Sequence, residues 1–148
     1  MYCNGIQSYR KTNVVTSDPG RLVVMCYEGA IDSLKLAKQK IKEQDYEKKE
    51  KAITKARDII DELLCSLDIE KGGAIASNLS SLYNYMLRRI LHADVTKDMS
   101  AIDEVIGLLN ELLSAWQEVA LKPESQVQSA QDSLYQAKRA AGSGYISV

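Results

Sequence analysis

The side chains that could perform acid–base or metal chemistry are few in this chain. It has one histidine, His92, which follows Arg88 and Arg89 at the end of an apolar, helix-like stretch. Arginine and histidine on one helix can bind and cleave a phosphodiester, whereas a di-iron bundle needs Glu-x-x-His on two helices, which one histidine cannot supply. Arginines near a helix C-terminus also interact favourably with its dipole. We therefore predict a solvated cationic helix end, no enzyme active site, no metal and no cofactor.

The three cysteines, Cys3, Cys26 and Cys65, lie far apart and form no CxxC pair. This pattern argues against a disulfide framework or a zinc site and favours a reducing compartment. Cys26 and Cys65 fall on apolar helical faces, so we expect both to be small core residues.

Charge and hydropathy exclude two partner classes. Nineteen Lys and Arg residues stand against 20 Asp and Glu, a formal net charge of -1, which is unlike the basic footprint of a nucleic-acid binder. The longest apolar run, Leu22 to Tyr27, is far shorter than the ~20 residues of a membrane-spanning helix. We expect neither nucleic-acid binding nor membrane insertion.

Apolar residues recur at intervals of three and four between the two prolines, Pro19 and Pro123, which is the period of one helical face. The pattern predicts helices from Pro19 to about Glu43, from the break at 44–46 to about Leu67, over 75–91, and from about Met99 to Ala120. Gly72-Gly73 would supply the positive-φ freedom for a tight reversal before the third helix. Short connections make neighbouring helices antiparallel, so we expect an all-α, up-down-up-down four-helix bundle over residues 18–122.

The two ends of the chain differ from this region. We expect residues 1–17 to form an N-terminal segment that can lie on an apolar groove as a lid. Residues 123–148 should form a weakly ordered tail with a further helix over part of 127–141.

Tyrosine replaces phenylalanine throughout: the chain has eight Tyr and no Phe. Tyrosine tolerates one wet end, and Tyr83 and Tyr85 lie on different sides of the third predicted helix. Each is either an aromatic at the edge of the bundle or part of a wall that meets a partner helix.

One string is characteristic of a known family. The run from Ser66 to Leu91, which contains EKGG and LYNYMLRR, closely resembles the signature of the FliS family of flagellin-specific export chaperones. Similar residues occur near the start, at Ile6, Tyr9 and 22–30, and in the last predicted helix, up to Trp116.

The resemblance implies a non-enzymatic bacterial protein with an antiparallel four-helix bundle. It would bind the C-terminal segment of flagellin in the cytoplasm, prevent premature polymerisation and deliver flagellin to the flagellar type III export apparatus. The resemblance implicates Ile6 and Tyr9 in capping a hydrophobic pocket and in docking to the export gate component FlhA. A homodimer is left open.

A chaperone of this kind needs an apolar groove that accepts amphipathic helices of its partner. Methionine suits such a groove because its flexible thioether adapts to different surfaces. With Ile6 and Tyr9, the predicted partner-binding residues are Leu22, Met25, Leu79, Leu82, Tyr83 and Met86. Each of these six could equally belong to the core. An RNA-cleaving bundle and a helical adaptor for another secreted or cytoskeletal protein remain the alternatives.

Overall fold

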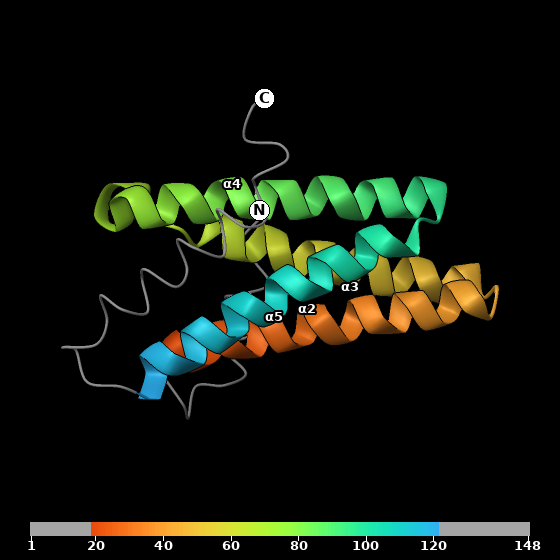
Figure 1. The fold of residues 1–148 in the computed structure, drawn as a ribbon, viewed down its shortest axis with the longest axis horizontal. Coiled ribbons are helices and arrows are strands. Elements are labelled where there is room, and N and C mark those ends of the chain that lie inside the picture. The colour runs from red at the N-terminus through yellow and green to blue at the C-terminus, as the bar shows by residue number, and fades with distance from the viewer. Residues whose placement is uncertain (1–18, 122–148) are drawn as a thin grey trace.

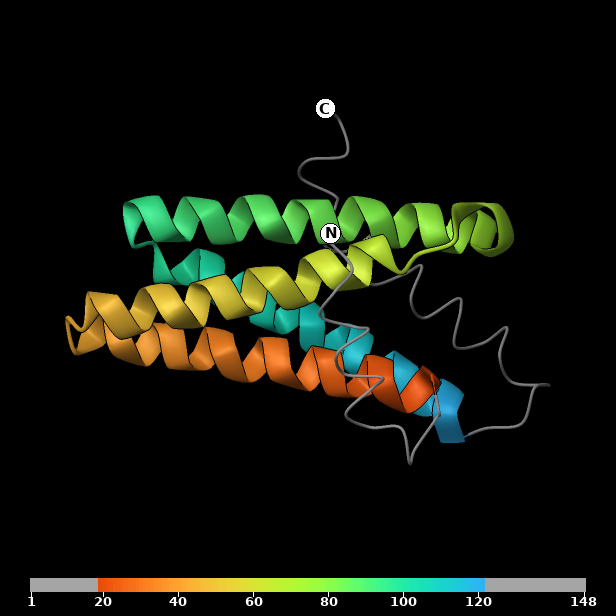
Figure 2. The same ribbon diagram turned by 180° about the vertical axis from the view of Figure 1, so that it is seen from behind.

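The computed structural model describes residues 19–121, which form four α-helices. They are α2 (Pro19–Lys42), α3 (Tyr46–Cys65), α4 (Ile69–Thr96) and α5 (Met99–Leu121). Successive helices run in opposite directions, and each of α2 and α4 packs against both α3 and α5 (Figures 1 and 2). The predicted all-α, antiparallel four-helix bundle is confirmed. The expectations for residues 1–17 and 123–148 lie outside the described residues.

Two short connections close the same end of the bundle. After α2, Gln44 adopts a left-handed conformation (φ 60°), and the Asp45 side chain caps α3 by accepting a hydrogen bond from the Lys48 backbone N–H at 3.2 Å. After α4, Lys97 is left-handed (φ 58°), and Asp98 accepts from the Ser100 backbone N–H at 3.0 Å. These side-chain acceptors satisfy backbone donors that a helix N-terminus leaves unpaired.

The reversal between α3 and α4 differs from the sequence prediction. The chain leaves α3 at Cys65, and Asp68 caps a single helical turn that ends at Gly72, where the predicted reversal was expected. Of these two glycines, only Gly73 has a positive φ (φ 56°, ψ -132°), and the chain bends there into the long part of α4. Gly72 is small for a different reason, because a Cβ on it would lie 2.5 Å from the Ala76 Cβ.

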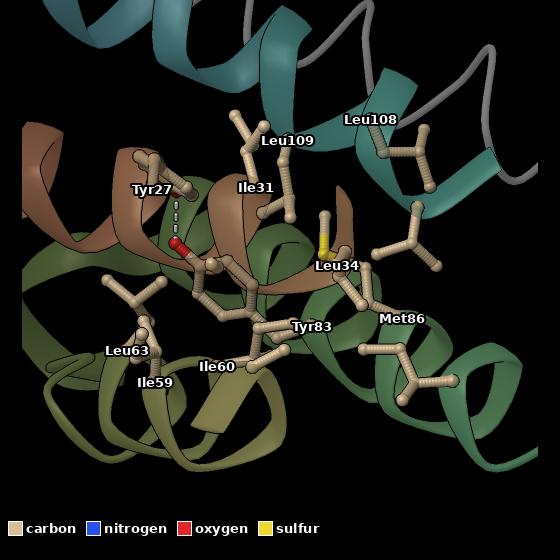
Figure 3. Close-up of a cluster of buried hydrophobic side chains, with 14 of the residues drawn as sticks. Tyr27, Ile31, Leu34, Ile59, Ile60, Leu63, Tyr83, Met86, Leu108 and Leu109 are labelled. Atoms are coloured by element: carbon tan, nitrogen blue, oxygen red, sulfur yellow. Dashed lines mark hydrogen bonds between the residues drawn. The ribbon is translucent and has the colours of Figure 1, made fainter. Parts of the chain in front are cut away.

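The apolar stripes of all four helices meet in one core. Figure 3 shows part of it, with Leu34 of α2, Ile60 of α3, Met86 of α4 and Leu109 of α5 converging. Each such side chain contributes about 1.5–3 kcal/mol when it is fully buried. The core is therefore shared by the helices rather than built on any one pair.

The two described cysteines do not share one environment. Cys26 is buried, as expected, but Cys65 is exposed, so the expectation that both belong to the core is wrong for Cys65. At 100° per residue, Cys65 lies about 200° around α3 from the buried Leu63 and faces outward.

Candidate functional site

The bundle is less tightly closed at one end than at the other. Helices α4 and α5 lie close at their connection, Lys97–Asp98, and diverge toward the opposite end, where α2 and α4 begin and α3 and α5 end (Figures 1 and 2). We call this the open end. Its apolar side chains are half-buried or exposed and come from every helix and the connection after α3: Val23, Leu64, Leu67, Ile69, Ile75, Leu113 and Trp116.

Partly exposed apolar side chains can bind the apolar face of an amphipathic segment, although the other end of the bundle also has exposed apolar residues, Tyr46, Leu91 and Val95. Ile69 is 51% exposed, although it is a large aliphatic residue between two acids. The open end can therefore contribute apolar area to a partner without any change in the backbone.

A polar cluster joins three helices behind the open end. The hydroxyls of Tyr27 on α2 and Tyr83 on α4 are hydrogen-bonded, and the Trp116 indole N–H on α5 donates to the Tyr27 hydroxyl at 3.0 Å (Figure 3 shows the tyrosine pair). The two tyrosine rings are tilted by 42°, with centroids 6.4 Å apart. Burial raises the pKa of both tyrosines well above the ordinary value. The cluster fixes α2, α4 and α5 relative to one another.

The structure distributes the predicted partner-binding residues unevenly. Met25 is half-buried near the start of α2, whereas five others are buried: Leu22, Leu79, Leu82, Tyr83 and Met86. Leu82 and Met86 have no exposed area, so a partner reaches them only if helices separate. Ile6 and Tyr9 lie outside the described residues. A role for these eight residues in partner binding stays a prediction.

Of the two tyrosines on α4, Tyr83 faces the core and Tyr85 is half-buried. The Tyr85 hydroxyl donates to Glu104 on α5, and the Arg89 Nε donates to the same carboxylate at 2.8 Å. Tyr85 is thus the edge aromatic of the pair.

The residues with the best nuclease chemistry do not form one site. Arg89 binds Glu104 on α5, whereas His92 Nε2 lies 3.3 Å from an Asp98 carboxylate oxygen in the connection after α4. The Ser100 hydroxyl, hydrogen-bonded to Asp98, is the main cause that lowers the pKa of that carboxyl. Within residues 19–121 no three His, Cys, Asp or Glu side chains gather to hold a metal ion, and none of the four helices is apolar enough over its length to span a bilayer.

The sequence patterns missed Ile69, Leu67 and Trp116 as surface residues of the candidate site. Trp116 and Leu67 belong to apolar stripes that predict core, and Ile69 belongs to none. The one local signal was an aliphatic residue between Asp68 and Glu70 that belongs to none of the predicted apolar stripes.

Comparison with known proteins gives a consistent result. A family model described as "Flagellar protein FliS" matches residues 2–123. The flagellar secretion chaperone FliS of Salmonella typhimurium is 40% identical over 128 residues, which cover 83% of this chain and 95% of that protein. The flagellar secretion chaperone FliS of Bacillus subtilis is 30% identical over 115 residues (78% and 85%), and the flagellar secretion chaperone FliSB of Pseudomonas aeruginosa is 36% identical over 106 residues (72% and 84%).

Proposed function

Because the chain belongs to the FliS family of flagellar secretion chaperones, we propose that it binds flagellin and holds that subunit for export. The observation that supports binding most directly is the open end, where apolar side chains from all four helices are only partly buried. A chaperone works by binding and release, so this function needs no catalytic group and no cofactor.

The proposed ligand is the C-terminal segment of flagellin, bound as amphipathic helices that are disordered in the free subunit. Ordering such a segment costs about 2–5 kcal/mol, which burial of roughly 1,000–3,000 Å² offsets. That area exceeds what one end of a small bundle offers. The segment must therefore extend from the open end along neighbouring helix surfaces, where Met25 is accessible.

Covering the segment explains how binding would serve assembly. Apolar helix faces that are buried on the chaperone cannot pair with other flagellin subunits, so premature polymerisation in the cytoplasm is suppressed. We propose that the complex is then delivered to the flagellar type III export apparatus, with Ile6 and Tyr9 of the N-terminal segment docking to FlhA.

The N-terminal segment can also act as an intramolecular competitor. A segment that covers the apolar site lowers apparent affinity by the fraction of closed molecules and hides a surface prone to association. Deleting residues 1–15 should leave flagellin binding unchanged or tighter and increase self-association, including any homodimer, in light scattering. A large loss of binding would contradict the lid.

Calorimetric titration with full-length flagellin and with flagellin lacking its C-terminal segment tests the main proposal. We expect a complex with the first and none with the second. Ile69→Asp, at the open end of α4, should weaken binding, whereas Val95→Asp, at the other end and 72% exposed, is the matched control. Equal binding of both flagellins would favour a general helical adaptor, and equal effects of the two variants would exclude the open end as the site.

A further inference from the structure

Glu62 on α3 is a buried acid with one carboxylate oxygen that has no hydrogen-bond partner among the described residues. The residue is 8% exposed, and its Oε2 atom makes no hydrogen bond to any described group. Carboxylates are rarely buried unless they are paired, because removing a charge from water costs several kcal/mol. The described part of the chain therefore offers this oxygen neither a cation nor a hydrogen-bond donor.

The charge of Glu62 affects titratable side chains on both α2 and α3. Across the helix interface, Cys26 of α2 is close enough that the Glu62 charge contributes, after burial, to raising the pKa of the thiol to about 11. On α3 itself, burial is the main cause that raises the pKa of Asp61; the positive charge of Arg57 opposes that rise, and the negative charges of Asp58 and Glu62 add to it. The Glu62 charge therefore acts on side chains of both helices, and a positive ligand beside it would be favoured.

Three apolar side chains also lie on one side of α2. Leu22, Met25 and Leu36 recur at three and eleven residues, so they share one helical face, and this face adjoins Cys26. Leu22 is nearly buried, Met25 is half-buried and Leu36 is 44% exposed. A helix lying along α2 and α3 would thus meet apolar side chains with one buried carboxylate among them.

We propose that Glu62 receives a lysine or arginine side chain of the bound flagellin segment, an inference that rests on the proposed function. An isolated carboxylate favours a side-chain cation over a metal ion, since among residues 19–121 no cluster of metal-binding side chains surrounds it. A cation placed there would gain a charge-assisted hydrogen bond in a site from which water is largely excluded. Glu62 then selects the register of the bound segment, because only one position along that segment can present the charge.

This role predicts opposite effects on stability and on binding. Glu62→Gln removes an unpaired buried charge, so the free chaperone should melt about 2–4 °C higher. The same variant removes the partner of the incoming cation, so Kd for flagellin should rise by at least about tenfold. Replacing a residue that has a purely structural role would not both stabilise the protein and weaken flagellin binding.

The experiment is calorimetric titration of the full-length chain with cognate flagellin, together with thermal melts. Glu111→Gln is the matched control, because it makes the same chemical change at an exposed position on α5 and should alter neither quantity. Each Lys and Arg of the flagellin C-terminal segment is then replaced by Gln, one at a time. One of these changes should weaken binding to the unmodified chaperone and have no further effect on Glu62→Gln.

Two results would overturn the inference while the proposed function stands. In the first, Glu62→Gln binds flagellin as well as Glu111→Gln does. In the second, binding is lost but no flagellin cation is coupled to Glu62, which means that the carboxylate acts within the chain. Failure of the unmodified protein and of Glu111→Gln to bind flagellin would instead overturn the proposed function and this inference with it.

Discussion

Removing single hydroxyls from the Tyr27–Tyr83–Trp116 cluster should produce a strongly non-additive pattern of stability. The cluster has three donor groups, the indole N–H and two O–H groups, joined by two hydrogen bonds. Tyr27 takes part in both bonds. Tyr27→Phe therefore breaks both and leaves the buried Tyr83 hydroxyl with no partner, whereas the half-buried indole N–H can reach water.

The expected magnitudes follow from the cost of an unsatisfied buried group. An orphaned buried hydroxyl costs about 1–3 kcal/mol, and a hydrogen bond contributes roughly 0.5–1.5 kcal/mol net. We expect Tyr27→Phe to lower the free energy of unfolding by about 2–3 kcal/mol and Tyr83→Phe by about 1 kcal/mol. In the double variant the orphaned hydroxyl is gone, so the loss should be only about 1–2 kcal/mol.

Urea denaturation followed by far-ultraviolet circular dichroism measures all three variants against the unmodified protein. The decisive quantity is the effect of Tyr83→Phe in the Tyr27→Phe background, where the change should stabilise the protein instead of destabilising it. If the double variant loses the sum of the two single losses, the hydroxyls act independently and the reasoning fails.

Three further outcomes are expected. Iodoacetamide at mildly alkaline pH should modify the exposed Cys65 and spare Cys26 until the protein unfolds, because Cys26 is buried and burial raises the pKa of its thiol to about 11. Mass spectrometry of the peptides measures the modification, and equal modification of both cysteines in the native state would contradict this expectation. Asp94→Ala should lower the free energy of unfolding by about 1–3 kcal/mol in urea denaturation, because it removes the carboxylate 2.6 Å from the Lys49 ammonium and leaves the more distant Glu50 carboxylate, 3.3 Å away, as its partner. Asp94→Ala with Lys49→Met should recover part of the loss. Gly73→Ala should cost about 1–3 kcal/mol in the same assay through backbone strain alone, since a Cβ there would touch nothing within 4 Å; a neutral result would mean that the bend at Gly73 relaxes.

The burial of Tyr27 and Tyr83 also predicts a pH dependence. Their pKa values are raised in the folded state relative to the unfolded state, so the neutral phenols stabilise the fold fully below the ordinary tyrosine pKa. The free energy of unfolding should decline as pH rises above about 10. Absorbance titration of the phenols should show two tyrosines that ionise only when the helices unfold.

The helices and much of the core could be predicted because they depend on local periodicity. The stripes that contain Tyr27 and Leu34 on α2, Ile60 on α3 and Met86 on α4 follow the 3.6-residue period, and all four residues are buried in the structure. Cys65 shows the limit of the pattern. It follows two residues of an apolar stripe in the sequence, yet its own side chain is exposed.

The site was less predictable because it depends on how the helices cross. Tyr27 and Trp116 are 89 residues apart in sequence, and no local pattern announces their hydrogen bond. Apolar periodicity likewise does not reveal that α4 and α5 diverge. The same apolar spacing describes Leu82, which is buried, and Leu113, which is half-buried. The missing partner of Glu62 became visible only when α2 and α3 were placed together.

Trp116 is the only tryptophan of the chain, and it lies where the open end meets a buried phenol. Its fluorescence therefore reports on one place in the molecule rather than on an average over several. A ligand that covers the indole, or one that breaks its bond to Tyr27, alters the surroundings that set the emission wavelength. The protein thus carries an optical signal of occupancy that needs no attached dye and that can be followed in real time during loading and release.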